Sequence, residues 1–307
     1  MKTKDMTSGH PFKILLFFAI PMILSVTLQQ LYNLADNFIA GHFITNLNSF
    51  EAVGIVYPVT VVFLDIAVGF GVGVGVVAAR FFGAKDFKNV KKTTTTGFIS
   101  MLVLGAVTTI LTSFGGNSVA GGYSAAYKIC YIAINIFTVA CNALSNFVSQ
   151  NIGASKYDRI MKGYVATVII CAIICAVSML IILPFREFWV RLFISDKAEG
   201  DIDIIVSSGK LFMLCVVPFF VLMVAKIPLD GILKGSTDML GFTLGTSVDL
   251  ALRVISALVL GKIFGYEGVF FAWPIGWAVG MLISIGMFFS GRWKRKCGYP
   301  KNLNKSV

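Results

Sequence analysis

The sequence predicts an all-α protein, a polytopic bundle of helices that crosses a membrane many times. Hydrophobic residues make up 57% of its 307 residues and charged residues only 13%, and the mean hydropathy is +0.83. A soluble domain of this length needs more polar surface than such a composition supplies. The apolar residues also fall into windows of about twenty, the length at which a helix crosses the roughly 30 Å hydrocarbon layer of a bilayer.

Eight windows have the length and composition of membrane-spanning helices, and polar loops separate them. The first window is much longer than the apolar region of a signal peptide and lacks a small-residue cleavage motif, so we expect it to be retained. The predicted spans cover residues 13–41, 52–80, 93–114, 120–151, 163–185, 204–226, 239–261 and 267–290.

Positive charge alternates from loop to loop. The N-terminus, the second, fourth and sixth loops and the C-terminal tail hold 19 of the 26 Lys and Arg residues, whereas the alternate loops hold four. Because Lys and Arg are retained on the cytoplasmic side, we expect a plasma-membrane protein with both termini in the cytoplasm. In this count Lys226 is a loop charge and Asp230 lies at the cytoplasmic end of the sixth span. The basic residues form short clusters rather than one patch, so the net charge of +11 does not indicate a nucleic-acid partner.

The chain contains a short internal repeat. It reads "ARFFGAKDFKNVKK" after the second span and "SQNIGASKYDRIMKG" after the fourth. Each copy ends a long helix with Gly-Ala and continues into a charged loop. Aligning Gly83 with Gly153 sets the two helices 70 residues apart. Parallel repeats of this kind are typical of transporters that build two lobes around a central site.

Seven segments spread along nearly the whole chain form a specific set. They are "IPMILSVTLQQLYNLADNFIAGHF" in the first span, "ARFFGAKD" after the second, "AGGYSAAYKI" and "SQNIGASKYDR" around the fourth, "GILKGSTD" after the sixth, "DLALRV" in the seventh and "GVFFAWPIGW" at the start of the eighth. Together they resemble the MATE (multidrug and toxic compound extrusion) family of transporters. The resemblance implies a cation-coupled antiporter of organic compounds, with twelve helices in two six-helix lobes.

The middle of the chain departs from that family pattern. The first three spans resemble the first three family helices, and from "TSFGGNSVAGGYSAAYK" onward the chain resembles the second lobe. About four central helices have no counterpart, and loss of an even number leaves the direction of the others unchanged. We therefore expect a shortened first lobe of three helices, residues 1–114, and a second lobe of five helices, residues 115–307. An internal deletion, a naturally short relative and an engineered chain all fit this pattern.

A carboxylate in the first span is the strongest candidate for ion coupling. Asp36 shares one helical face with other polar residues, namely Ser25, Gln29, Tyr32 and Asn33, of which the last three are candidates for lining a cavity. A carboxylate in hydrocarbon either stays protonated or binds a cation, and alternation between these states can couple ion movement to a change of shape. The resemblance agrees, because the family has an acid implicated in proton or sodium coupling at this position. The alternative is an Asp held by hydrogen bonds for packing alone.

Two further sets of polar residues lie in predicted spans. Asn135, Asn142 and Asn146 follow helical spacing in the fourth span and either line a wet cavity or bond to neighbouring helices. Asp249 and Arg253 lie four residues apart in the seventh span, where they can form an intramembrane ion pair, with a structural role favoured over a functional one. Asp65 in the second span has no family counterpart.

These observations predict a secondary transporter that exports organic cations and other xenobiotics in exchange for protons or sodium. We expect small organic cations and membrane lipid as partners, a possible homodimer, no cofactor and no metal site, because no catalytic, metal-binding or phosphate-binding motif is present. One alternative is a transport-inactive remnant of such a transporter. A lipid-linked oligosaccharide flippase is disfavoured, because only Arg253 and Lys128 could make its central cavity cationic.

Overall fold

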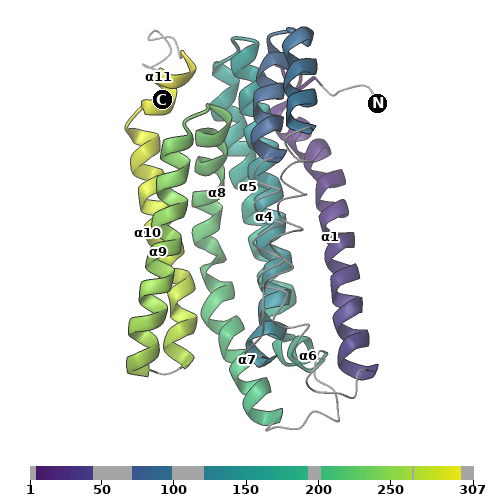
Figure 1. Cartoon of the computed structure of the whole chain (residues 1–307), viewed down its shortest axis with the longest axis vertical. Coiled ribbons are helices and arrows are strands. Elements are labelled where there is room, and N and C mark those ends of the chain that lie inside the picture. The colour runs from purple at the N-terminus through teal and green to yellow at the C-terminus, as the bar shows by residue number, and fades with distance from the viewer. Residues whose placement is uncertain (1–4, 44–70, 99–120, 193–201, 265, 299–307) are drawn as a thin grey trace.

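The computed structural model describes residues 5–43, 71–98, 121–192, 202–264 and 266–298, and every regular element in these ranges is helical. Helices with no label in Figure 1 cover residues 71–83 and 87–98. The labelled helices are α1 (Pro11–Phe43), α4 (Gly121–Gly153), α5 (Asp158–Ile182), α6 (Arg186–Arg191), α7 (Ile202–Val216), the 3-10 turn η1 (Val217–Phe219), α8 (Phe220–Gly235), α9 (Met239–Phe264), α10 (Tyr266–Phe289) and α11 (Arg292–Cys297).

The described helices agree with the predicted all-α membrane bundle. Five stretches are long and apolar enough to cross a bilayer: Pro11–Gln29, Ile129–Gly153, Asp158–Ile182, Val206–Gly235 and Glu267–Phe289. Helix α9, at 26 residues, also has sufficient length. Five predicted spans therefore coincide with α1, α4, α5, α9 and α10. The predicted spans 52–80 and 93–114 lie largely outside the described residues.

The sixth predicted span is wrong in shape and in length. Pro218 falls in the 3-10 turn η1, which separates α7 from α8, and the chain stays helical to Gly235 rather than ending at 226. Proline has no N–H to give the preceding turn, so the helix breaks there. Beyond 226 the residues Ile232 and Leu233 are fully buried. Lys226 is consequently not a loop charge, because it lies within a helix that continues for more than two turns.

The helices lie side by side along the long axis of the molecule, with α9 and α10 at one side, α1 at the other and α4, α5 and α8 between them (Figure 1). Helix α4 is central, since it contacts α1, α5, α7 and α8. Its side chains Phe137, Leu144 and Phe147 are fully buried. In contrast, Leu180 on α5 and Leu258 on α9 are exposed, as expected of a surface that faces lipid.

Three helices end in the same turn. In each turn one residue adopts a left-handed conformation and donates its N–H to the carbonyl three residues back, and the next residue donates to the carbonyl five residues back. This is the hydrogen-bond pattern of the Schellman motif. The left-handed residues are Lys85 (φ 58°), Ser155 (φ 57°) and Thr237 (φ 63°). The repeat seen at Gly83 and Gly153 thus has a third copy at Gly235, which ends α8.

The first two copies of the repeat cross each other at their glycines. A Cβ atom on Gly83 would overlap the backbone carbonyl of Gln150, and a Cβ atom on Gly153 would overlap that of Arg80. Because Arg80 and Gln150 are themselves 70 residues apart, the two contacts are equivalent and reciprocal, as across a two-fold axis. Only glycine permits backbones to approach this closely.

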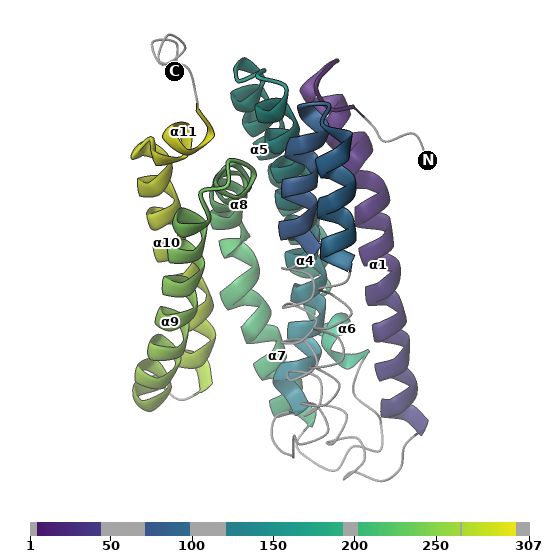
Figure 2. The same cartoon turned by 45° about the horizontal axis from the view of Figure 1, so that its top comes forward.

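One end of the bundle is held together by polar contacts between distant segments. The N-terminal segment binds the end of α4, where the Met6 N–H donates to Gln150 Oε1 (2.9 Å), and the turn after it, where Lys156 Nζ donates to the carbonyl of Thr7 (2.7 Å). The Tyr157 hydroxyl donates to the carbonyl of Cys297 in α11 (3.1 Å). The start of α1, the α4–α5 turn and α11 therefore lie at the same end (Figures 1 and 2).

A buried row of charges as candidate functional site

Helix α8 carries a buried ion pair in its interior. Lys226 Nζ lies 2.7 Å from Asp230 Oδ2, one helical turn away, and the two residues are only 6% and 2% exposed. The other carboxylate oxygen of Asp230 accepts a hydrogen bond of 2.7 Å from the hydroxyl of Ser284 on α10. Both oxygens of this carboxylate are therefore occupied, and the contact joins α8 to α10.

Helix α9 carries a second ion pair. Arg253 Nη2 donates to Asp249 Oδ1 over 2.8 Å, and Asp249 is 7% exposed. The guanidinium of Arg253 also lies over the ring of Trp273 on α10, 4.2 Å from the ring centroid. This is the geometry of a cation–π contact, which attracts Arg independently of its carboxylate partner.

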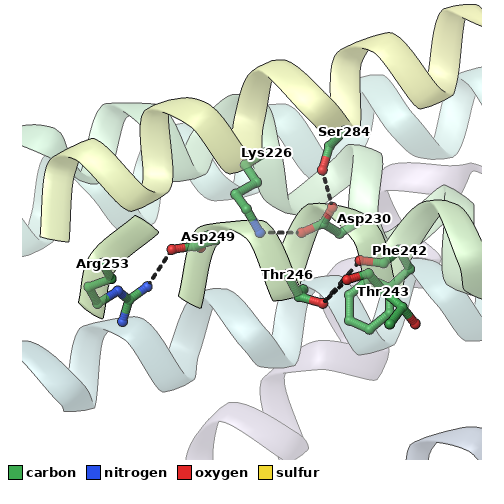
Figure 3. A network of polar contacts seen from close by, with 8 residues as sticks. All are labelled: Lys226, Asp230, Phe242, Thr243, Thr246, Asp249, Arg253 and Ser284. Carbon is green, nitrogen blue, oxygen red and sulfur yellow. Dashed lines mark hydrogen bonds and ion pairs between the residues drawn. The ribbon is translucent and has the colours of Figure 1, made fainter. Parts of the chain in front are cut away.

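The two pairs form one row across α8, α9 and α10. Figure 3 shows Arg253, Asp249, Lys226, Asp230 and Ser284 following one another, so that positive and negative groups alternate. A Cβ atom on Gly280 of α10 would lie 2.9 Å from Lys226 Cε and 3.1 Å from Asp249 Cβ. Lys226 and Asp249 thus pack against the same glycine from two helices.

Small residues make room for the row. Besides Gly280, a Cβ atom on Gly245 would lie 2.9 Å from Ser284 Oγ, and one on Gly276 would lie 2.5 Å from Asp249 Oδ1. At three positions on α9 and α10, the lack of a side chain on glycine therefore leaves the space that the polar and charged side chains of the row occupy. Glycines at such positions let neighbouring membrane helices approach closely while polar side chains bond between them.

The row balances two cations against two carboxylates, which is the condition for placing such groups in a membrane. Each isolated charge costs several kcal/mol to bury, and pairing offsets this only while both partners remain charged. Addition of a proton or a small cation at either carboxylate would upset the balance and leave one of the built-in cations without its partner.

The predicted site in the first span is only partly within the described residues. Gln29 is exposed on α1. Tyr32, Asn33 and Asp36 lie on the same helix, but their side chains are outside the described part, and Asp65 is wholly outside it. The proposed coupling role of Asp36 stays a prediction.

The polar residues predicted on α4 take different partners. Asn135 bonds to the backbone of its own helix, with Nδ2 2.9 Å from the carbonyl of Tyr131. Asn146 faces helix 71–83, since a Cβ atom on Gly75 would lie 3.8 Å from its Oδ1. Asn142 is buried, and its Oδ1 has no hydrogen-bond partner among the described residues. Asn142 therefore places a buried acceptor without a described partner in the middle of α4.

Sequence reasoning missed the α8 pair and its serine partner. It counted Lys226 in a loop and gave Asp230 no role, because a window of about twenty residues ended the sixth span at residue 226. The signal was present in the "KGSTD" segment, which repeats the Gly-Ala turn that ends the helices at Gly83 and Gly153. Recognition of this third copy would have placed both charges inside the helix. Ser284 has no comparable signal.

Comparison of the whole chain with known protein families identifies the family to which it belongs. The MatE family model matches it twice, over residues 21–117 and 106–266. The chain belongs to the MatE family. It is therefore a multi-pass membrane protein. The family match confirms the resemblance that the sequence segments had indicated.

Individual MatE proteins match shorter parts of the chain. The multidrug export protein MepA of Staphylococcus saprophyticus is 25% identical over 169 residues, which are 52% of this chain and 36% of that protein. MepA of Staphylococcus haemolyticus is 29% identical over 101 residues, 33% of this chain and 22% of that protein. The chain thus matches about a third or less of the length of these relatives.

A solved structure resembles the whole fold. The crystal structure of a MATE protein in complex with MaL6 aligns with a TM-score of 0.68 at 16% sequence identity, covering 97% of this chain and 99% of the other. The likeness supports the MATE-type bundle.

Proposed function

We propose that the chain is a secondary transporter that exports organic cations and other xenobiotics in exchange for protons or sodium. Support comes from the membership of the MatE family and from the names of its relatives, which are multidrug export proteins. The observation that carries the proposal is the buried, charge-balanced row on α8, α9 and α10. Ionisable groups inside a membrane are costly, and they mark ion or substrate pathways.

In this proposal two places respond to the coupling ion. Asp36 in α1 binds the proton or sodium ion. The row in α8–α10 responds by exchange of partners, because Lys226 packs beside Asp249 as well as pairing with Asp230. Neutralisation of Asp230 would release Lys226 towards Asp249, and Arg253 would keep its contact with Trp273. The exchange would alter how α8 packs against α9 and α10.

The proposal includes two lobes of unequal size, residues 1–114 and 115–307. The two family matches overlap at residues 106–117, which include the boundary between these lobes, and so support this division. A first lobe of three helices is half of the six-helix lobe that the family pattern implies, so we propose that a second copy of the chain completes the cavity in a homodimer. Both termini lie on the cytoplasmic side of the plasma membrane. Lys156 is exposed, so labelling of a Lys156→Cys variant from the cytoplasmic side tests this orientation.

Transport of a fluorescent cationic dye tests the function. The full chain is reconstituted in liposomes, a proton or a sodium gradient is imposed, and dye efflux is measured while crosslinking counts the subunits. We expect efflux with one of the gradients, and Asp36→Asn should abolish it without reducing membrane insertion, since loss of a charge favours insertion. Asp158→Asn, at an exposed acid at the start of α5, is the matched control and should transport normally.

Two outcomes would decide against parts of the proposal. Absence of efflux with either gradient from folded protein would favour the transport-inactive alternative. Efflux that persists in Asp36→Asn would show that the coupling ion binds elsewhere, and robust efflux from a demonstrated monomer would exclude the homodimer as the active form.

A further inference from the structure

Helix α11 is a short basic helix fixed rigidly to the end of the bundle. The ring of Trp293 is fully buried and stacks on Phe288 at the end of α10, with 5.5 Å between ring centroids. The indole N–H of Trp293 donates to the carbonyl of Phe288 (3.1 Å), and the carbonyl of Cys297 accepts a bond from Tyr157 on the α4–α5 turn. Both ends of α11 are therefore attached to neighbouring elements.

Four of the six residues of α11 are cations: Arg292, Lys294, Arg295 and Lys296. Arg292 is already neutralised, since its Nε lies 3.1 Å from the buried carboxylate of Asp238. Arg295 and Lys296 are exposed, and within the described part of the chain no carboxylate forms an ion pair with either. The helix thus presents two uncompensated positive charges from a rigid support.

Basic residues of α11 line a shallow hollow in the protein surface. The hollow has a volume of about 410 Å³, and its lining consists of Arg292, Arg295 and Lys296. Among the described residues, no acidic side chain contributes to this lining. The residues that line the hollow therefore carry two guanidinium groups and one ammonium, and guanidinium donors match the oxygens of a phosphate in pairs.

The hollow lies at the level of a membrane surface. The apolar span Glu267–Phe289 ends three residues before α11, and Phe289 is 79% exposed at that end. An anion bound in the hollow would thus have apolar surface beside it on the bilayer side.

We propose that α11 binds the phosphate of an anionic membrane lipid, with Arg295 and Lys296 as the principal ligands of the headgroup. An inorganic phosphate shares the headgroup chemistry but would gain nothing from the exposed Phe289. The lipid is favoured for this reason. The proposal does not depend on transport activity.

Lipid binding to the purified full chain tests the proposal. Native mass spectrometry measures retention of phosphatidylglycerol, with phosphatidylcholine as the neutral comparison and inorganic phosphate as a competitor. We expect phosphatidylglycerol to bind more tightly than phosphatidylcholine. The double variant Arg295→Gln/Lys296→Gln should weaken its binding about thirtyfold, at roughly fivefold for each basic residue at an anionic surface. Because both side chains are exposed, the unfolding temperature should not change.

The matched control is Lys91→Gln/Lys92→Gln, which removes two exposed cations from helix 87–98 and should leave phosphatidylglycerol binding unchanged. Equal loss in the control would mean that overall charge, not the hollow, attracts the lipid. Unchanged binding in the α11 variant, or equal affinity for the two lipids, would overturn the proposal. Displacement of the lipid by inorganic phosphate at equal concentration would identify a free-phosphate site instead. If the double variant is unstable, Lys296→Gln alone should still weaken binding about fivefold.

Discussion

Removal of one member of the α8 ion pair should cost far more than removal of both. In Asp230→Asn the ammonium of Lys226, only 6% exposed, loses the carboxylate that lies 2.7 Å away. Breaking a buried pair in this way destabilises a protein by about 3–5 kcal/mol. The hydrogen bond from Ser284 adds little to this figure, because the amide oxygen of Asn can still accept it.

The double variant Lys226→Met/Asp230→Asn removes the charge imbalance. Replacement of a whole buried pair by uncharged groups is often neutral or stabilising. Met also fills most of the volume of the Lys stem against Gly280, so no large cavity forms. We therefore expect the double variant to unfold within about 1 kcal/mol of the original protein, which leaves a coupling energy of several kcal/mol between the two positions.

Equilibrium unfolding in mixed micelles of mild detergent and dodecyl sulfate measures these differences. Asp249→Asn serves as the comparison. Its free energy of unfolding should fall by less, because Arg253 is half-buried rather than buried and retains its contact with the ring of Trp273. A double variant as unstable as Asp230→Asn would refute the reasoning, since the loss would then come from packing and not from charge. Dye efflux by the stable double variant would separate the roles: normal gradient-driven efflux would make the pair structural, and its loss would make the pair part of coupling.

Two further predictions concern the turn repeat and the loop charges. Gly153→Ala should destabilise the protein by about 3 kcal/mol, the upper part of the range for overpacking, because its Cβ would meet the rigid backbone of Arg80. Gly73→Ala, with nothing within 4 Å, is the control and should be neutral or slightly stabilising in the same unfolding measurement. Hydrogen bonds from Lys210, which has the larger effect, and from Arg191 lower the pKa of the Glu187 carboxyl below its ordinary value of 4.5. Its stabilising contact between α6 and α7 should be fully present above that value and lost as the pH falls through the lowered pKa. Hydrogen exchange of the α6 amides should therefore differ between the original protein and Glu187→Gln near neutral pH but not in strong acid, and a difference that persists in acid would contradict the assignment.

Hydropathy and residue spacing were sufficient to predict much of the helical architecture. The spans that became α1, α4, α5, α9 and α10 were readable because a membrane helix satisfies its own backbone and needs only a long apolar window. The repeat at Gly83 and Gly153 was also readable. The structure adds the reason for the glycines, which is the reciprocal backbone contact at the crossing of the two helices.

Local spacing also predicted that Asp249 and Arg253 can pair, because residues four apart lie on the same face of a helix. The same rule applies to Lys226 and Asp230, yet an averaged window treats each as a polar interruption that ends a span. Whether such a pair lies in a loop or in the protein interior depends on where the helix ends. That end was set by a turn nine residues further on, at Gly235.

The sequence by itself determined the membrane class, most of the described spans, the family and the pair of Asp249 with Arg253 within one helix. Only the tertiary structure decided that the two pairs make one row. Lys226 and Asp249 meet through Gly280, and Asp230 bonds to Ser284, a residue 54 positions away. These contacts join different helices, so no periodicity within one helix encodes them. They follow from the close packing of α8, α9 and α10, which excludes solvent and leaves each buried charge dependent on partners from its neighbours.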